Sequence, residues 1–317
     1  MPLHPGIQPI IDAIAAASSS AGTATQTVAE RRTAMDAMTS ATFLSVSNAG
    51  PAMADEQTHL IDVAGGQIRV RVYRPRVDTA LPAYVYFHGG GFWLGNIDLY
   101  DDSCRATAAA VDCVVVAVGY RLAPEHRFPT AAEDCYAGLC WTVEHASMLG
   151  VDSSHIAVGG GSAGGNLAAV IPLMARDRGG PMLCAQVLDI PVTDLTMSSP
   201  SITSNGEGYL LTKASMEEYR AYYAPDAATR MNPYASPLLA ADHSRLPPAF
   251  VTTCEYDPLR DEGEQYAAKL IAAGVPVTVQ RALGHIHGSH HMVKLAPDAA
   301  VYGARVETFL RYHLHGA

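Results

Sequence analysis

The chain has 317 residues, of which 49% are hydrophobic and 16% are charged, and its formal net charge is −10. This length allows one large domain with an accessory lobe, or two domains. The composition is typical of a folded globular protein and excludes a disordered one. The acidic balance argues against nucleic acid or an anionic membrane as a partner, because both would repel a negative surface.

The cysteines and the N-terminal residues bear on location. The six cysteines are scattered without a CxxC pair, which indicates buried free thiols in a reduced compartment. No run reaches the roughly 18 apolar residues of a membrane span. Residues 1–17 lack a basic segment, and polar residues and prolines interrupt their apolar run, so we expect an amphipathic helix rather than a signal peptide. One face of that helix carries Ile7, Ile10, Ile11 and Ile14. These features predict a cytoplasmic protein.

The predicted elements alternate along most of the chain. Residues 1–50 have helical spacing, and Gly65-Gly66 then separates two apolar runs, the second with period two, which predicts a hairpin over 60–73. The following strands are expected at 83–87, 113–118, 156–159, 185–190, 250–254 and 277–281, and the helices at 101–111, 131–147, 162–178, 259–274 and 297–314. This order predicts an α/β fold with a mostly parallel central sheet covered by helices on both faces. Catalytic groups in such sheets lie at the C-terminal ends of the strands.

One segment interrupts the alternation. Residues 196–228 begin with a Ser/Thr/Gly-rich stretch and continue as a Tyr-rich helical run over 213–223, and they are longer than an ordinary connection. We expect this insertion and residues 1–50 to form a helical cap. The catalytic domain would then consist of residues 51–195 and 229–317.

The central motif is Gly160-x-Ser162-x-Gly164, between a predicted strand and a predicted helix. A strand that turns sharply into a helix exposes one side chain at the tip of a strained bend, and glycines on both sides remove the Cβ clashes. The alternative is a phosphate-binding loop, but the stretch lacks the GK[ST] ending and the acidic residue of a dinucleotide fingerprint. The pattern therefore favours Ser162 as a nucleophile.

A second motif, His88-Gly89-Gly90-Gly91, directly follows the strand predicted at 83–87. Acyl transfer places negative charge on the carbonyl oxygen, and N–H donors must already face it. We expect these donors to be Gly90, Gly91 and Ala163. A plain flexible loop is the alternative, but it does not account for HGGG upstream of a strand-to-helix GxSxG.

The acid of a triad is expected after the strand at 250–254. Asp257 lies there and precedes Pro258, which favours an extended backbone. Its place fits the chain order Ser…Asp…His. Glu255 and Asp261 are the other candidates, and Asp261 could instead be a charge at a helix N-terminus.

The base is expected on the loop after the strand at 277–281. His287, before Gly288, is best placed by motif, and His285, His290 and His291 are expected to be ordinary loop or rim residues. The four histidines could also indicate a metal site. No carboxylate or second cluster completes one in the sequence, so we expect no metal.

Five motifs occur in one order, at residues 88–91, 120–129, 160–165, 257–263 and 287–288. Over residues 60–315 the chain resembles the hormone-sensitive-lipase-like esterases, the bacterial family IV carboxylesterases. The resemblance implies an α/β-hydrolase core, a helical cap, and cleavage of small acyl esters without a cofactor. It also favours a homodimer. Two residues depart from the family pattern: Gly161, where Asp or Thr is usual, and Ser289, where an aromatic residue is usual.

The predicted substrate is a small-molecule acyl ester of short to medium chain. Phe92 and Trp93 follow the oxyanion loop and are candidates for one wall of the pocket. For the aromatic candidates, including those from the cap, packing within the cap is as good an explanation as lining the pocket. The candidates from the cap are Tyr209, Leu210, Leu211, Tyr219, Tyr222 and Tyr223.

Three other functions are compatible with the motifs. The same triad would serve an amidase or a deacetylase. A catalytically silent ligand-binding homologue would lack a triad member, whereas all three positions are filled here. An interaction role for the acidic surface has no specific support.

Overall fold

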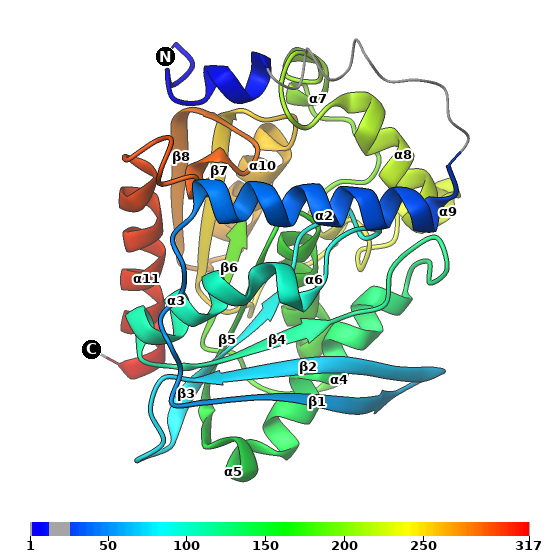
Figure 1. Ribbon diagram of the computed structural model, residues 1–317. Helices are drawn as coiled ribbons and strands as arrows, with labels where there is room; N and C mark the ends of the chain where they lie inside the picture. The colour runs from blue at the N-terminus through cyan, green and yellow to red at the C-terminus, as the bar shows by residue number, and fades with distance from the viewer. Residues whose placement is uncertain (1, 13–25, 317) are drawn as a thin grey trace.

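The computed structural model describes residues 2–12 and 26–316, and a single eight-stranded sheet lies at its centre (Figure 1). The strand order is β1-β2-β4-β3-β5-β6-β7-β8. The pairings of β1 with β2 and of β2 with β4 are antiparallel, and all the others are parallel. The strands are β1 (Asp55–Val63), β2 (Gly66–Arg74), β3 (Leu81–Phe87), β4 (Val114–Gly119), β5 (Val151–Gly161), β6 (Ala185–Asp189), β7 (Ala249–Tyr256) and β8 (Val277–Ile286). The predicted α/β class and mostly parallel sheet are confirmed.

Two strands are longer than their apolar runs indicate. β5 begins at Val151, five residues before the run at 156–159, and β8 continues to Ile286. Residues 152–155 of β5 are polar and partly or largely exposed, so they belong to no apolar run. In β8, Ala282 pairs with Cys254 of β7, and a shift in register then places Ile286 opposite Tyr256.

Helices cover both faces of the sheet, as predicted. On one face α4 (Thr130–Glu144), α6 (Ala163–Arg178) and α10 (Arg260–Ala272) contribute to the larger apolar core. On the other face α3 (Asp101–Val111) and α11 (Ala299–His315) enclose a second core. The helix expected at 131–147 is divided, because α4 ends at Glu144 and the short α5 (Ala146–Leu149) follows. The 3-10 helices are η1 (Ile97–Tyr100), η2 (Pro237–Leu239) and η3 (Ser289–His291).

The segments expected to form a cap lie beyond the C-terminal end of β6 (Figure 1). They contain α2 (Val28–Val46), α7 (Ser201–Ser204), α8 (Lys213–Tyr223) and α9 (Ala227–Arg230). Helix α8 begins with a capping box, in which Thr212 and Ser215 each bond the other's backbone N–H. An ion pair joins α2 to α8, with 2.6 Å between Arg31 Nη1 and Glu218 Oε1. The division of the chain into cap and catalytic domain stays a prediction.

The described N-terminal residues pack against the core. Residues 8–12 are helical, Ile7 is fully buried, and the backbone N–H of His4 donates to the carbonyl of Gly284 at 2.9 Å. The rest of the helix expected over 1–17, including Ile14, lies outside the described residues. Within residues 2–12 and 26–316, no helix is both long enough and apolar enough to cross a lipid bilayer.

Candidate active site

The backbone around Ser162 forms a strained bend between β5 and α6. Ser162 has φ +59° and ψ −114°, a conformation that L-residues rarely adopt. A Cβ at either Gly160 or Gly164 would collide with the carbonyl oxygen of Phe87, so this close approach to β3 requires glycine. The Ser162 N–H donates to the carbonyl of Asp189 at 2.8 Å, which ties the bend to the end of β6.

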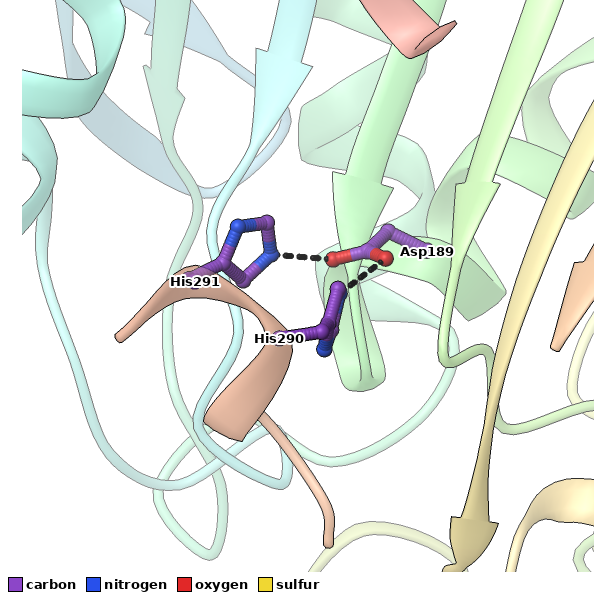
Figure 2. Close-up of side chains that lie close together, drawn as sticks. All are labelled: Asp189, His290 and His291. Carbon is purple, nitrogen blue, oxygen red and sulfur yellow. Dashed lines mark hydrogen bonds and ion pairs between the residues drawn. The ribbon is translucent and has the colours of Figure 1, made fainter. Parts of the chain in front are cut away.

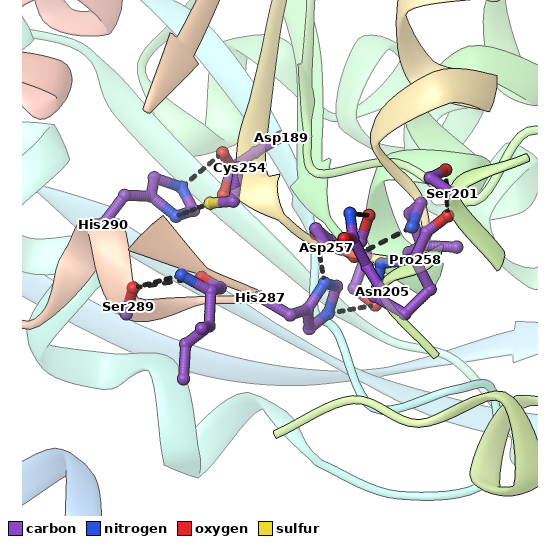
Figure 3. Close-up of polar contacts among 12 residues, drawn as sticks. Asp189, Ser201, Asn205, Cys254, Asp257, Pro258, His287, Ser289 and His290 are labelled. Atoms are coloured by element: carbon purple, nitrogen blue, oxygen red, sulfur yellow. Dashed lines mark hydrogen bonds and ion pairs between the residues drawn. The ribbon is translucent and has the colours of Figure 1, made fainter. Parts of the chain in front are cut away.

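Three side chains from separate strand ends meet at this bend. His287 Nε2 lies 3.1 Å from Ser162 Oγ. His287 Nδ1 lies 2.7 Å from Asp257 Oδ2 (Figure 3). Asp257 is fully buried and the side chain of His287 is 14% exposed. The predicted nucleophile, base and acid are therefore within hydrogen-bonding distance in the order that a triad requires.

The other two candidate acids have different partners. Glu255 Oε2 accepts a hydrogen bond from the backbone N–H of Gly284 at 2.7 Å. Asp261 Oδ2 accepts from the backbone N–H of Ser201 at 2.8 Å, and Asp261 also pairs with Arg260. The geometry therefore favours Asp257 as the residue that orients the imidazole.

Residues of the 196–228 insertion support the Asp257 loop (Figure 3). Asn205 Nδ2 donates to the carbonyls of Asp257 at 3.1 Å and Glu255 at 3.2 Å. Ser201 Oγ donates to the carbonyl of Pro258 at 2.6 Å. Sequence reasoning missed both residues, because they belong to no motif and lie 50 to 57 positions from their partners.

Two glycines with positive φ shape the oxyanion loop, residues 88–91. Gly90 has φ +123° and Gly91 has φ +60°, and the Gly90 carbonyl accepts from Leu94 N at 2.8 Å. Neither the Gly90 nor the Gly91 N–H donates to a described residue, so both donors are available to a substrate oxygen. Ala163 is the first residue of α6, where backbone N–H groups are unpaired within the helix.

His88 positions this loop and is not an acid or base. Its ring is buried and stacks on Tyr120 with centroids 4.2 Å apart, and Tyr120 Oη donates to the His88 carbonyl at 2.8 Å. Burial lowers the pKa of His88 to about 4. The ring is therefore neutral at pH 7, and its Nδ1–H donates to the Gly89 carbonyl at 2.8 Å.

Ser289 supports the loop that carries His287. Its side chain is fully buried; Oγ accepts from Ile286 N and donates to the Ile286 carbonyl, both at 3.0 Å. His285 Nδ1 lies 3.0 Å from the same oxygen. These polar contacts hold the turn that follows His287.

The sequence predicts that His285, His290 and His291 are ordinary loop or rim residues. His285 instead belongs to β8, and both His285 and His290 are buried, so neither lies on a rim. The reasoning that no carboxylate completes a histidine cluster is also wrong. Asp189, the last residue of β6, lies between His290 and His291, with 2.7 Å from each Nε2 to a separate carboxylate oxygen (Figure 2). Burial raises the pKa of Asp189, but the two imidazoles outweigh burial and hold it well below its usual range. Asp189 also occupies the space beside Gly161, where an added Cβ would lie 3.5 Å from Oδ2.

The aromatic residues after the oxyanion loop pack beneath the insertion. Phe92 and Trp93 are buried; Phe92 stacks on Tyr223 at 3.9 Å, and Trp93 contacts Tyr219 and Tyr222 at 5.6 and 5.4 Å between ring centroids. These contacts favour the packing interpretation over a pocket wall. Tyr219 also adjoins the oxyanion loop, since a Cβ at Gly91 would lie 2.6 Å from its ring.

The two candidates from the loop before α8 differ in environment. The ring of Tyr209 lies 5.2 Å from that of Tyr256, next to the acid loop, whereas Leu210 is 43% exposed. Their contact with substrate stays a prediction.

Comparison with known proteins identifies the family. The alpha/beta hydrolase fold family matches residues 84–291. The chain belongs to this family, in its hormone-sensitive-lipase-like branch. It is 43% identical over 252 residues to carboxylesterase NlhH of Mycobacterium tuberculosis, covering 78% of this chain and 79% of the relative. It is 38% identical over 272 residues to ethyl acetate hydrolase of Pseudomonas putida, covering 82% and 85%. The solved structure of a hyperthermophilic esterase from Pyrobaculum calidifontis superposes with a TM-score of 0.89 at 39% identity and 98% coverage of both chains.

Proposed function

We propose that this protein is a serine carboxylesterase that hydrolyses short- to medium-chain acyl esters through an acyl-enzyme intermediate. The observation that carries the proposal is the position of His287, which lies within hydrogen-bonding distance of both Ser162 and Asp257. Membership of a family whose relatives are carboxylesterases supports it. A hydroxyl needs an adjacent base to become a nucleophile, and that base needs a third group to fix its tautomer.

The reaction would proceed in two halves. His287 takes the proton of Ser162 as Oγ attacks the ester carbonyl, and the N–H groups of Gly90, Gly91 and Ala163 bind the oxyanion. Asp257 stabilises the imidazolium, which then gives its proton to the leaving alcohol. Water attacks the acyl-enzyme by the same route and restores the serine.

We expect Ser162 to accept a short acyl group. The ring of Tyr219 adjoins the oxyanion loop, because an added Cβ at Gly91 would lie 2.6 Å from it. The likeness to an ethyl acetate hydrolase points the same way.

A panel of substrates tests the proposal. Purified protein would be assayed with p-nitrophenyl esters from acetate to palmitate, beside p-nitroanilides of the same acyl groups. We expect the highest kcat/KM on acetate to hexanoate, little or no anilide cleavage, and loss of activity in Ser162→Ala. Faster anilide than ester cleavage would indicate an amidase, and activity that survives Ser162→Ala would exclude the serine mechanism.

We also propose a cytoplasmic location, a homodimer, and a cap built from residues 1–50 and 196–228. All six cysteines are free, which suits a reduced compartment. The ion pair between Arg31 and Glu218 supports a common lobe for the two cap segments. A small acyl ester is the only partner that this function requires.

A further inference from the structure

A second group of chemically active side chains lies beside the triad but takes no part in it. Asp189 ends β6, and His290 and His291 belong to η3, about 100 residues further along the chain (Figure 2). Each Nε2 lies 2.7 Å from a different oxygen of the carboxylate. The ligand atoms of the three residues all lie within 4.8 Å of one another.

We propose that Asp189, His290 and His291 bind one divalent transition-metal ion of the zinc type. Two imidazole nitrogens and one carboxylate oxygen suit Zn²⁺ and its neighbours Co²⁺ and Ni²⁺, whereas Mg²⁺ and Ca²⁺ prefer oxygen ligands. On binding, the proton leaves each Nε2 so that the lone pair faces the ion. An imidazolium releases that proton to solvent and keeps its Nδ1 proton, whereas a neutral imidazole changes to the tautomer that carries its proton on Nδ1. Three protein ligands leave a position for water, as in open zinc sites.

The surroundings hold the ligands in place and leave the site open to solvent on one side. The Nδ1 of His290 lies 3.3 Å from Cys254 Sγ, a contact that fixes the ring and directs Nε2 toward Asp189. The backbone of Asp189 is held in the sheet opposite Thr252 of β7. The His291 side chain is 61% exposed while that of Asp189 is 14% exposed, so an ion can enter from solvent on the His291 side.

An ion at this position would join two parts of the candidate active site. The Asp189 carbonyl accepts the N–H of Ser162 at 2.8 Å, and His290 follows His287 by three residues in the chain. The ion would therefore link the strand behind the nucleophile to the loop that carries the base. The three ligands are close together only in the folded chain, so the ion should bind the folded state and not the unfolded one. Ion binding should therefore raise the Tm.

A simple hydrogen-bonded anchor is the competing explanation. It accounts for the buried His290 as well as a metal site does. It accounts less well for His291, whose exposed side chain could be solvated by water instead of converging on the same carboxylate. The proposal does not depend on esterase activity, because its test measures metal binding.

The test is a titration of the chelator-treated full chain with ZnCl₂ by isothermal calorimetry, together with the visible spectrum of the Co²⁺ form. We expect one ion per chain, a raised Tm with Zn²⁺, and the intense Co²⁺ absorption of a low-coordinate site. His291→Ala changes an exposed residue and should keep the fold, checked by circular dichroism, yet weaken Zn²⁺ binding at least tenfold. Asp189→Asn should also weaken Zn²⁺ binding at least tenfold.

The matched control is His4→Ala. His4 and His285 share the carboxylate of Asp298 at longer distances, 3.5 and 3.3 Å, and this arrangement should not provide the binding site. Unchanged affinity in His4→Ala is therefore expected. The proposal fails if the native chain shows no saturable Zn²⁺ binding, if His291→Ala binds as tightly as the native chain, or if His4→Ala rather than His291→Ala removes binding.

Discussion

Replacing Ser289 by alanine tests how the base loop is held. The change removes one hydroxyl that accepts from Ile286 N, donates to the Ile286 carbonyl, and contacts His285 Nδ1, each at 3.0 Å. Ser289 is fully buried, so water cannot replace these bonds without rearrangement. An unsatisfied buried donor costs about 1–3 kcal/mol, and we expect a loss of about 2 kcal/mol in the free energy of unfolding.

The same change should lower turnover, because Ile286 and Ser289 lie on either side of His287. If about 1.4 kcal/mol of the loss is felt in the position of the imidazole, kcat falls about tenfold. Urea denaturation gives the stability, and p-nitrophenyl butyrate hydrolysis gives kcat and KM. The loss should fall on kcat, since the loop positions the base and does not bind substrate.

Ser244→Ala is the matched control. Ser244 donates to Asp242 at 3.0 Å on an exposed turn, so its loss should change stability by less than about 0.5 kcal/mol. If Ser289→Ala behaves like Ser244→Ala in both stability and kcat, the proposed support of the base loop is refuted.

Three further changes test other parts of the account. Gly91→Ala should lower kcat/KM by about 10²–10³, measured with the same ester, because it displaces an oxyanion donor at φ +60° and places Cβ 2.6 Å from the Tyr219 ring; unchanged kinetics would exclude Gly91 from the oxyanion hole. Asn205→Ala should reduce kcat more than it changes KM and cost about 1–2 kcal/mol in urea unfolding, because two loop carbonyls lose their donor; a change in KM alone would count against a positioning role. Glu262→Gln should remove a pH-dependent loss of stability. Burial raises the pKa of Glu262 well above its usual range, so the folded chain keeps a proton that the unfolded chain releases above about pH 4.3. Wild-type stability should therefore fall, relative to the variant, by up to about 1.4 kcal/mol per pH unit as the pH rises from 4.3 toward the folded pKa. If the difference in unfolding free energy between wild type and Glu262→Gln is the same at pH 5 and pH 8, the raised pKa of Glu262 is contradicted.

The elements and the candidate triad can be predicted from the sequence, because each is marked by a local sequence pattern. The helix expected at 213–223 matches α8 (Lys213–Tyr223), and the strand-end rule placed Asp257 and His287 after the correct strands. The contacts of Asn205 could not be predicted, since they depend on how α7 folds back onto the loop after β7.

The Asp189 cluster is an intermediate case. Asp189 lies near the end of the strand predicted at 185–190, and the rule that active groups gather at strand ends could have connected it with His290 and His291. Asp189 lies about 100 residues from the two histidines in the sequence, and only the folded sheet brings the end of β6 close to the loop after β8. Likewise, the buried positions of Phe92 and Trp93 follow from their contacts with α8, which aromatic composition alone does not specify.

Covalent labelling tests the central claim most directly. A fluorophosphonate reacts with a serine only when a neighbouring base activates it, and peptide mass spectrometry locates the adduct. We predict a single adduct on Ser162, formed at least 100-fold more slowly in His287→Ala. An adduct on a different residue, or equal labelling rates in the two proteins, would contradict the proposed triad.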